Sequence, residues 1–282
     1  MSFGRGHTVG NLGDVFKHFV LLELLPTVVQ EKAAKRSKDF TFGYVETHCQ
    51  APEVSLSEGG LWEKGIGQLV NKYIGNGEDI RDSSNMKYLF YTLDEVFRNK
   101  VYPSSWCLVR NRLKDLGLRN FNFTLYSPSA EVAQVMKVFL QDLEHSNIEY
   151  FCKDGLVHFK DNLRRVDFVF LDPDYTPLKG DNLNKSVIDA LKAGKYLRSR
   201  GISFILAVPY YSDKQWGKVL SELSVASFLF KPTDVSALPD NVKGVGLLVG
   251  GIDPFHLPLC HASLQRAFGN LGSFEFALEE SK

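Results

Sequence analysis

The 282-residue sequence has few cysteines and no long hydrophobic run. The four cysteines form no CxxC pair and no Cys/His cluster of the kind that binds zinc; they are Cys49, Cys107, Cys152 and Cys260. No apolar run approaches the roughly 18 to 20 residues that span a bilayer, and the chain does not open with a basic segment followed by an apolar core. We therefore expect a soluble, cytoplasmic protein with reduced thiols and no membrane partner.

An excess of charge of one sign is also missing. Lys plus Arg and Asp plus Glu each number 33, so bulk electrostatics select no partner. No GxGxxG follows the first predicted strand and no GxxxxGK[ST] occurs, which leaves an ordinary dinucleotide site or P-loop unsupported. With 44% hydrophobic residues, the chain is able to bury a full core.

Short apolar runs alternate with longer amphipathic ones, a pattern typical of a parallel sheet covered by helices. The sequence predicts seven strands, near residues 40–46, 122–126, 148–152, 167–171, 203–208, 227–231 and 245–249. A helix from Asp14 to about Gln30 precedes them, with Asp14 as its N-cap and Pro26 as a kink or stop. Lys17 and His18 lie near its start. They either form part of a site or belong to a solvated helix tip.

Residues 53–104 differ in character from the sequence around them. They contain Gly59-Gly60, Gly75-Asn76-Gly77 and a polar run, while apolar residues recur at helical spacing in Trp62–Tyr73 and Tyr88–Phe97. This pattern predicts an inserted helical subdomain at 53–104, and a main domain made of residues 1–52 and 105–282.

Polar residues follow four of the predicted strands. In an open α/β sheet, ligands bind outside the carboxyl ends of the strands. The residues at these ends are Glu46-Thr47-His48-Cys49, Tyr126-Ser127, Lys153-Asp154-Gly155 and Asp172-Pro173-Asp174-Tyr175. The buried run that ends at Asp172 would fix this carboxylate in place. The sequence therefore predicts a site at this edge of the sheet.

These blocks, together with Gly10–His18, Tyr102–Ser105 and Ser127–Ser129, resemble the bacterial 23S rRNA adenine-N6 methyltransferases of the RlmJ type over nearly the whole chain. The resemblance implies an α/β, Rossmann-like, S-adenosylmethionine-dependent methyltransferase fold with a seven-stranded, mostly parallel sheet and a small helical insertion. It implies S-adenosyl-L-methionine as methyl donor and a 23S rRNA adenine as acceptor. The positions it implies for the donor are His18, His48, Ser105, Tyr126, Asp154, Gly155 and Asp172.

The same resemblance implies that Asp172, Pro173 and Tyr175 are catalytic. An adenine amine is a poor nucleophile because its lone pair is conjugated with the ring. Asp172 and the Pro173 carbonyl would each accept one N–H and direct the lone pair towards the methyl group. Tyr175 would stack on the flipped base, a contact worth about 1–3 kcal/mol.

Three features depart from the family pattern. Cys49-Gln50-Ala51-Pro52 replaces a glycine-rich turn, and Tyr126 replaces an acidic residue. These two changes favour an alternative, a degenerate methyltransferase that acts as a nucleic-acid-binding protein, for instance in the use of external DNA. Asp174 replaces a proline, and Asp172-x-Asp174 also fits a Mg²⁺-dependent phosphatase whose first Asp is the nucleophile.

One basic segment bears on the partner. From Arg98 to Arg119 there are six Lys or Arg residues and a single acid, Asp115, interleaved with Tyr102 and Trp106. Such a segment could hold phosphates while its aromatic rings touch bases; a solvated basic helix is the alternative. We expect as partner 23S rRNA, or another nucleic acid that presents a flipped adenine. The sequence does not fix the oligomeric state, and we favour a monomer.

Overall fold

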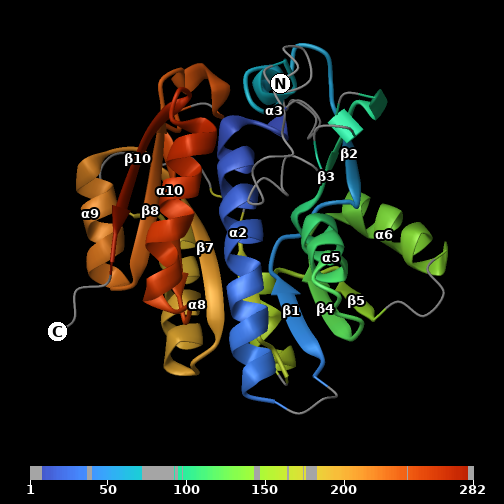
Figure 1. Ribbon diagram of the computed structural model, residues 1–282. Coiled ribbons are helices and arrows are strands. Elements are labelled where there is room, and N and C mark those ends of the chain that lie inside the picture. Colours follow the sequence, from blue (N-terminus) through green and yellow to red (C-terminus); the bar gives the residue numbers. More distant parts are fainter. Residues whose placement is uncertain are drawn as a thin grey trace.

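The computed structural model describes residues 8–36, 40–71, 92, 95–96, 98–142, 147–163, 165–173, 175, 183–239 and 241–278. Its main sheet has eight strands in the order β10-β8-β9-β7-β6-β1-β4-β5 (Figure 1). Their bounds are β1 Phe42–Glu46, β4 Phe121–Tyr126, β5 Ile148–Phe151, β6 Phe168–Leu171, β7 Ser203–Tyr210, β8 Ala226–Pro232, β9 Gly244–Gly250 and β10 Gly272–Ala277. All seven predicted strands are present.

The direction of the strands identifies the fold. Strands β5, β4, β1, β6 and β7 are parallel neighbours, β9 runs antiparallel to both β7 and β8, and β10 runs antiparallel to β8. This arrangement is the Rossmann-like methyltransferase fold, which confirms the predicted fold class. The predicted strand count was one too low because β10 is a half-exposed edge strand with no continuous apolar run.

Helices cover both faces of the sheet (Figure 1). The helices of one face pack in the larger core: α2 Leu12–Ala34, α5 Ser105–Asp115, α6 Ala130–Asp142 and α10 Leu257–Phe268. Those of the other face are α7 Gly155–His158, α8 Lys185–Ser199 and α9 Asp213–Glu222. Short 3-10 turns are η4 Phe159–Asn162, η5 Val235–Ala237 and η6 Pro254–His256. None of the helices in the described part of the chain is long and apolar enough to cross a membrane.

Helix α2 differs in two respects from its prediction. Its N-cap is Asn11, whose side-chain oxygen accepts the N–H groups of Gly13 at 2.7 Å and Asp14 at 3.2 Å. The interpretation of Asp14 as the cap was wrong. The helix also continues through Pro26 to Ala34, because α5 and α10 flank it and most of its side chains are buried, which outweighs the hydrogen bond that a proline removes.

The segment 53–104 is tied to the main domain by strands that the sequence did not reveal. Strand β2 (Glu53–Ser55) pairs antiparallel with β3 (Val101–Pro103), so the chain leaves and returns through a two-stranded ribbon. Between them lie η1 (Leu61–Glu63) and α3 (Ile66–Val70), within the first predicted helix. The second, Tyr88–Phe97, lies mostly outside the described residues, and the domain boundaries stay a prediction.

Candidate active site

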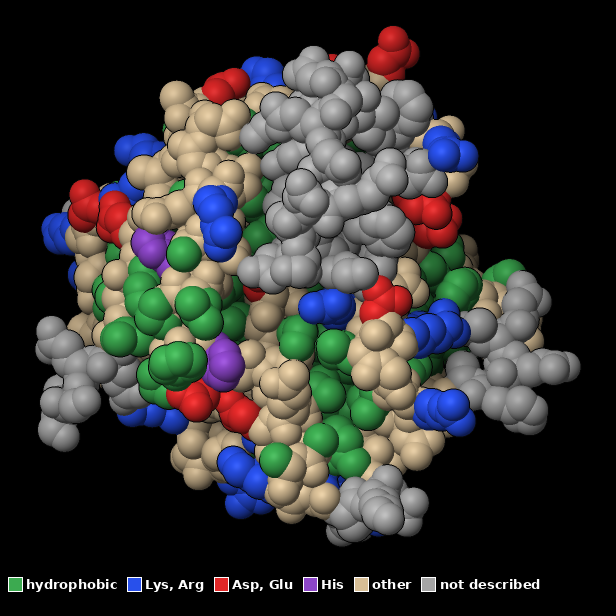
Figure 2. Space-filling view, in the orientation of Figure 1, with side chains coloured by type: hydrophobic (Ala, Val, Ile, Leu, Met, Phe, Trp, Pro, Cys, Tyr) green, Lys and Arg blue, Asp and Glu red, His purple; other side chains and the backbone are tan. Residues whose placement is uncertain are grey.

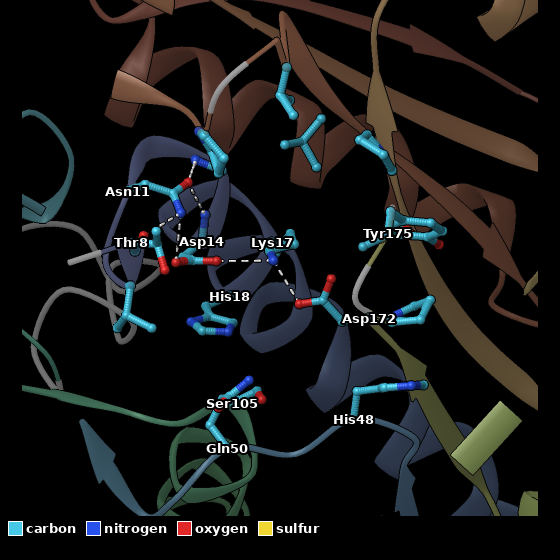
Figure 3. Close-up of a pocket in the computed structure, with 18 of the residues that line it drawn as sticks. Thr8, Asn11, Asp14, Lys17, His18, His48, Gln50, Ser105, Asp172 and Tyr175 are labelled. Atoms are coloured by element: carbon cyan, nitrogen blue, oxygen red, sulfur yellow. Dashed lines mark hydrogen bonds and ion pairs between the residues drawn. The ribbon is translucent and has the colours of Figure 1, made fainter. Parts of the chain in front are cut away.

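A cavity of about 310 Å³ lies at the carboxyl ends of β1, β6 and β7 (Figure 3). The start of α2, the start of α5 and the stretch before β9 complete its walls. Its polar lining includes Asp14, Lys17, His18, His48, Gln50, Ser104, Ser105 and Asp172. Its apolar lining includes Pro173, Ala207, Val208, Pro209, Val242 and Val245. The sheet edge at which the sequence predicted a site therefore holds a cavity lined by both polar and apolar residues.

Asp172 lines the cavity directly after the end of β6. The four strand residues before it are fully buried, so the backbone that carries the carboxylate is held by the core on both faces. The side chain itself is 24% exposed and accepts a hydrogen bond from the Lys17 ammonium at 2.6 Å. A rigid strand and a cation thus orient this carboxylate towards the cavity.

Lys17 is shared between two carboxylates (Figure 3). Its Nζ lies 2.6 Å from Asp172 Oδ2 and 3.0 Å from Asp14 Oδ1, and its side chain is only 14% exposed. Burial alone would lower the pKa of Lys17, but the charges and hydrogen bonds of Asp172 and Asp14 outweigh it and raise that pKa above its ordinary value. Lys17 is therefore a permanent cation beside Asp172.

His18 occupies the next position of the same helix. Its Nδ1 lies 2.9 Å from the Tyr102 hydroxyl, and the two rings stack at 5.6 Å between centroids. Burial lowers the pKa of His18 to about 4, although Asp14 acts in the opposite direction. At neutral pH this ring is uncharged, so its contribution to a site is hydrogen bonding rather than charge.

Ser105, at the first turn of α5, is committed to a partner within the protein. Its hydroxyl donates to Glu46 Oε1 at 2.6 Å, and Tyr44 donates to the other oxygen at 2.7 Å. Burial raises the pKa of Glu46 to about 7, although these two hydrogen bonds oppose the shift. Towards a ligand in the cavity, the Ser105 hydroxyl acts through its remaining acceptor capacity.

The predicted residues His48, Asp154 and Gly155 lie close together, but only His48 lines the cavity. The His48 Nε2 lies 3.9 Å from Asp154 Oδ1, and His48 lines the cavity while Asp154 is about half exposed. Asp154 caps α7 by accepting the Leu156 N–H at 2.9 Å. A Cβ on Gly155 would lie 2.2 Å from the Thr47 oxygen, so only glycine lets these two turns touch.

Tyr126 is placed differently from its predicted role in donor binding. Its ring is 1% exposed and stacks on Phe151 at 5.3 Å, and its hydroxyl accepts from Asn162 at 2.9 Å. Its backbone oxygen accepts the Cys49 N–H at 2.7 Å. The Tyr126 side chain packs in the core and does not line the cavity. An aromatic ring is stabilised by burial, whereas the carboxylate of an acidic residue would remain in contact with water.

Tyr175 and Pro173 form part of the apolar side. The Tyr175 hydroxyl donates to the Ala207 oxygen at 2.5 Å, which ties the ring to β7. Burial, with Asp172 and Tyr211 nearby, raises the pKa of Tyr175 above its ordinary value, so the hydroxyl stays protonated. Tyr211 also lines the cavity, a role that the sequence interpretation missed. Asp174 lies outside the described residues.

The basic residues of segment 98–119 do not all have the same surroundings. Arg112 acts on the half-buried Glu23 of α2, whose pKa burial raises to about 7 against the pull of Arg112 and Arg266. Lys100 instead lies 5.5 Å above the Trp62 ring. On the face in Figure 2, Lys and Arg are interspersed with Asp and Glu. Arg112 and Lys100 thus each act on a residue within the protein.

Comparisons with known proteins bear on the fold. No protein-family model matches the sequence, and no curated protein matches it. Among solved structures, protein LPL1258 from Legionella pneumophila, of the family model DUF519, is 16% identical with a TM-score of 0.71, over 97% of this chain and 99% of that chain. At this identity the likeness shows the fold alone.

Two more distant structures also match. A probable spermidine synthase from Corynebacterium glutamicum is 9% identical with a TM-score of 0.44, over 99% of this chain and 78% of its own. Human methyltransferase-like protein 13, in complex with SAH, is 10% identical with a TM-score of 0.41, over 90% of each chain.

The structure brings together most of the predicted site and adds to it. His18, His48, Ser105, Asp172, Pro173 and Tyr175 line one cavity. Asp14 was predicted only as a helix cap and Lys17 had no predicted role in catalysis, since nothing local in the sequence shows that Lys17 meets a strand end 155 residues away. The unusual polar pair Lys17-His18 within an apolar helix was the available signal.

Proposed function

We propose that the protein is an S-adenosylmethionine-dependent methyltransferase that acts on the N6 amine of an adenine in 23S rRNA. The observation that carries the proposal is the Asp172 carboxylate, held at a strand end by Lys17 at 2.6 Å, with Pro173 and Tyr175 beside it on the same cavity. The methyltransferase fold and the RlmJ-type order of sequence blocks support the same assignment.

The residues present fit the amino-acid end of the donor. A buried hydroxyl of Ser104 that makes no hydrogen bond within the described part of the chain lines the cavity beside Ser105 and His18. His18, His48 and Ser105 offer the hydrogen-bonding groups that a donor's carboxylate, amine and hydroxyls need. Asp154, close to His48, is placed to accept from an exocyclic amine. When bound, S-adenosylmethionine supplies an electrophilic methyl group on its sulfonium.

The protein's own part in the transfer follows from the acceptor side. Asp172 accepts one N–H of the adenine amine and the Pro173 carbonyl accepts the other, which directs the nitrogen lone pair along one line. Lys17 keeps the Asp172 carboxylate oriented through the 2.6 Å hydrogen bond, because its charge remains at every physiological pH. The Tyr175 ring, tied by its hydroxyl to Ala207, gives the base a fixed surface.

The changed positions support a second candidate, a nucleic-acid-binding protein without transfer activity. The Cys49 N–H donates to Tyr126 and the Gln50 oxygen accepts the Trp106 indole N–H at 3.1 Å, so the loop after β1 is engaged in the fold. The phosphatase alternative depends on Asp174, which lies outside the described residues, so no observation of the structure adds to it.

Isothermal titration with S-adenosylmethionine separates these functions. Saturable binding, lost in a Ser105→Val, His48→Ala double variant, is the expected result. No binding at millimolar donor would overturn the methyltransferase proposal, and retention of RNA binding by the same protein would then support the second candidate. Mg²⁺-dependent release of phosphate from a generic ester would instead support the phosphatase.

A further inference from the structure

The Asp14 carboxylate does not itself cap α2, but it contacts Asn11, which does. Because Asn11 caps α2, the Asp14 side chain is available for contacts on the cavity side, where it is 16% exposed. Its Oδ2 accepts the Gly10 backbone N–H at 2.9 Å and the Asn11 amide at 2.9 Å. Its Oδ1 lies 3.0 Å from the Lys17 ammonium.

The first set of contacts fixes a turn that forms the cavity wall. Gly10 has a backbone φ of 75°, a left-handed conformation that favours glycine. The Asn11 amide also donates to the Thr8 oxygen at 2.8 Å. Thr8, Val9 and Asn11 all line the cavity, so Asp14 holds the turn from Thr8 to Asn11 over the site (Figure 3).

The other contact of Asp14 fixes the cation beside Asp172. A lysine ammonium is a compact charge on a flexible stem, and one partner alone leaves it several positions. Two carboxylates on opposite sides, at 3.0 Å and 2.6 Å, restrict it to the place between them. The ionisable groups around Lys17 are Asp14 and His18 on its own helix, Asp172 after β6 and Glu46 on β1.

We propose that Asp14 is a positioning residue for Asp172, because it holds the cavity-lining turn Thr8–Asn11 and Lys17 in one network. The orientation of the Asp172 carboxylate then depends on this network being intact. The inference rests on the proposed function in that it takes Asp172 as the group that meets the acceptor.

The test uses the full-length protein with Asp14→Asn. This variant keeps an oxygen that can accept from Gly10 but removes the charge that faces Lys17. Asp189→Asn is the matched control, because Asp189 also joins two lysines, Lys185 and Lys192, on the exposed side of α8. Thermal unfolding checks that both variants fold, and Asp14→Glu serves as the charge-conserving variant if Asp14→Asn does not.

The first measurement is independent of catalysis. NMR of labelled lysine side chains at neutral pH, with the Lys17 signal assigned by its loss in Lys17→Arg, measures how fast the hydrogens of the Lys17 ammonium exchange with water. Asp14→Asn should raise this exchange rate about 10-fold, because the ammonium loses one of its two carboxylate partners, and Asp189→Asn should leave it unchanged. With Asp14→Glu, the exchange rate should stay near that of the wild type. An unchanged Lys17 exchange rate in Asp14→Asn would overturn the network.

The second measurement is methyl transfer to 23S rRNA fragments. Asp14→Asn should lower kcat about 10- to 100-fold, as expected for a misplaced reacting group, while the donor Kd stays unchanged. Faster exchange of the Lys17 ammonium hydrogens with an unchanged kcat would overturn the positioning role. If the wild type itself transferred no methyl group, the proposed function would fail, whereas the exchange measurement would still decide the network.

Discussion

The Lys17 ammonium on α2 donates to the Asp172 carboxylate after β6 over 2.6 Å, although the two residues are 155 positions apart. This contact joins the helix that precedes the sheet to the strand end at its centre. A carboxylate that must accept N–H bonds has to keep its orientation, and a charge-assisted hydrogen bond from a buried cation fixes that orientation.

Replacing Lys17 tests this pair. Lys17→Met should lower kcat of methyl transfer about 10- to 100-fold and lower the free energy of unfolding by about 1–3 kcal/mol, because two partly buried carboxylates lose their cation. Lys17→Arg should recover stability better than activity, since its planar fork does not reproduce the point charge. Lys185→Met, on the exposed side of α8, is the control and should behave as the wild type. Equal activity in Lys17→Met and wild type would remove the pair from the mechanism.

The strand pattern alone predicted the part of the site made by strand ends, whereas His18 on α2 and Ser105 on α5 were expected only from the family resemblance. Asp172, His48 and Asp154 each follow an apolar run, and parallel strands bring such residues to one edge whatever the rest of the chain does. What could not be predicted came from contacts between distant elements. The network of Asp14 and Lys17 depends on how α2 crosses the sheet, and the burial of Tyr126 depends on Phe151 on the neighbouring strand.

The fold shows the same difference between features that a local pattern predicts and features that depend on distant contacts. Long apolar strands such as β7 and β9 were predicted because burial on both faces leaves a continuous apolar run. The three-residue strands β2 and β3 are too short to show a period, and β10 lies at an exposed edge. Helix α2 continues through Pro26 because its packing against several elements outweighs the effect of the proline. A local sequence pattern does not show this packing.

Glu46 should make stability depend on pH. Its pKa in the folded protein is about 7 against an ordinary value of 4.5. The folded state therefore keeps a proton that the unfolded chain releases, so this stabilisation is present below about pH 4.5 and is lost as pH rises through about 7. Over that window it amounts to about 3 kcal/mol.

Urea unfolding of wild type and Glu46→Gln at about pH 5 and about pH 8 measures this effect. The wild type should lose stability between the two values relative to Glu46→Gln, which has no proton to release. The comparison is needed because Glu23, also with a pKa of about 7, contributes in the same window. Parallel behaviour of the two proteins would show that Glu46 ionises normally.

Two glycines should respond in opposite ways to alanine. Gly155→Ala places a Cβ 2.2 Å from the Thr47 oxygen and should cost about 1–3 kcal/mol while weakening donor binding at His48 and Asp154. Gly217→Ala, within α9 where no atom lies within 4 Å, should gain about 0.5–1 kcal/mol. Urea unfolding measures both. Equal effects would mean that the turns after β1 and β5 do not touch.

Tyr175 separates the role of a ring from that of a hydroxyl. Tyr175→Leu removes the surface for the base and should weaken RNA binding by about 1–3 kcal/mol, with donor affinity unchanged. Tyr175→Phe keeps the ring and loses only the hydrogen bond to Ala207, so most of the binding should remain. Tyr196→Leu, an aromatic residue on α8 outside the lining of the cavity, is the control. Fluorescence anisotropy of a labelled rRNA fragment reads the affinities, and equal losses in Leu and Phe would exclude stacking.

The most direct test of the account is nucleoside analysis by mass spectrometry after an unmodified 23S rRNA transcript is incubated with the protein and S-adenosylmethionine. The account predicts N6-methyladenosine with the wild type, and about 100- to 1,000-fold less with Asp172→Asn at unchanged donor affinity. No methylated adenosine with a wild type that binds the transcript, or an equal yield with Asp172→Asn, would contradict it.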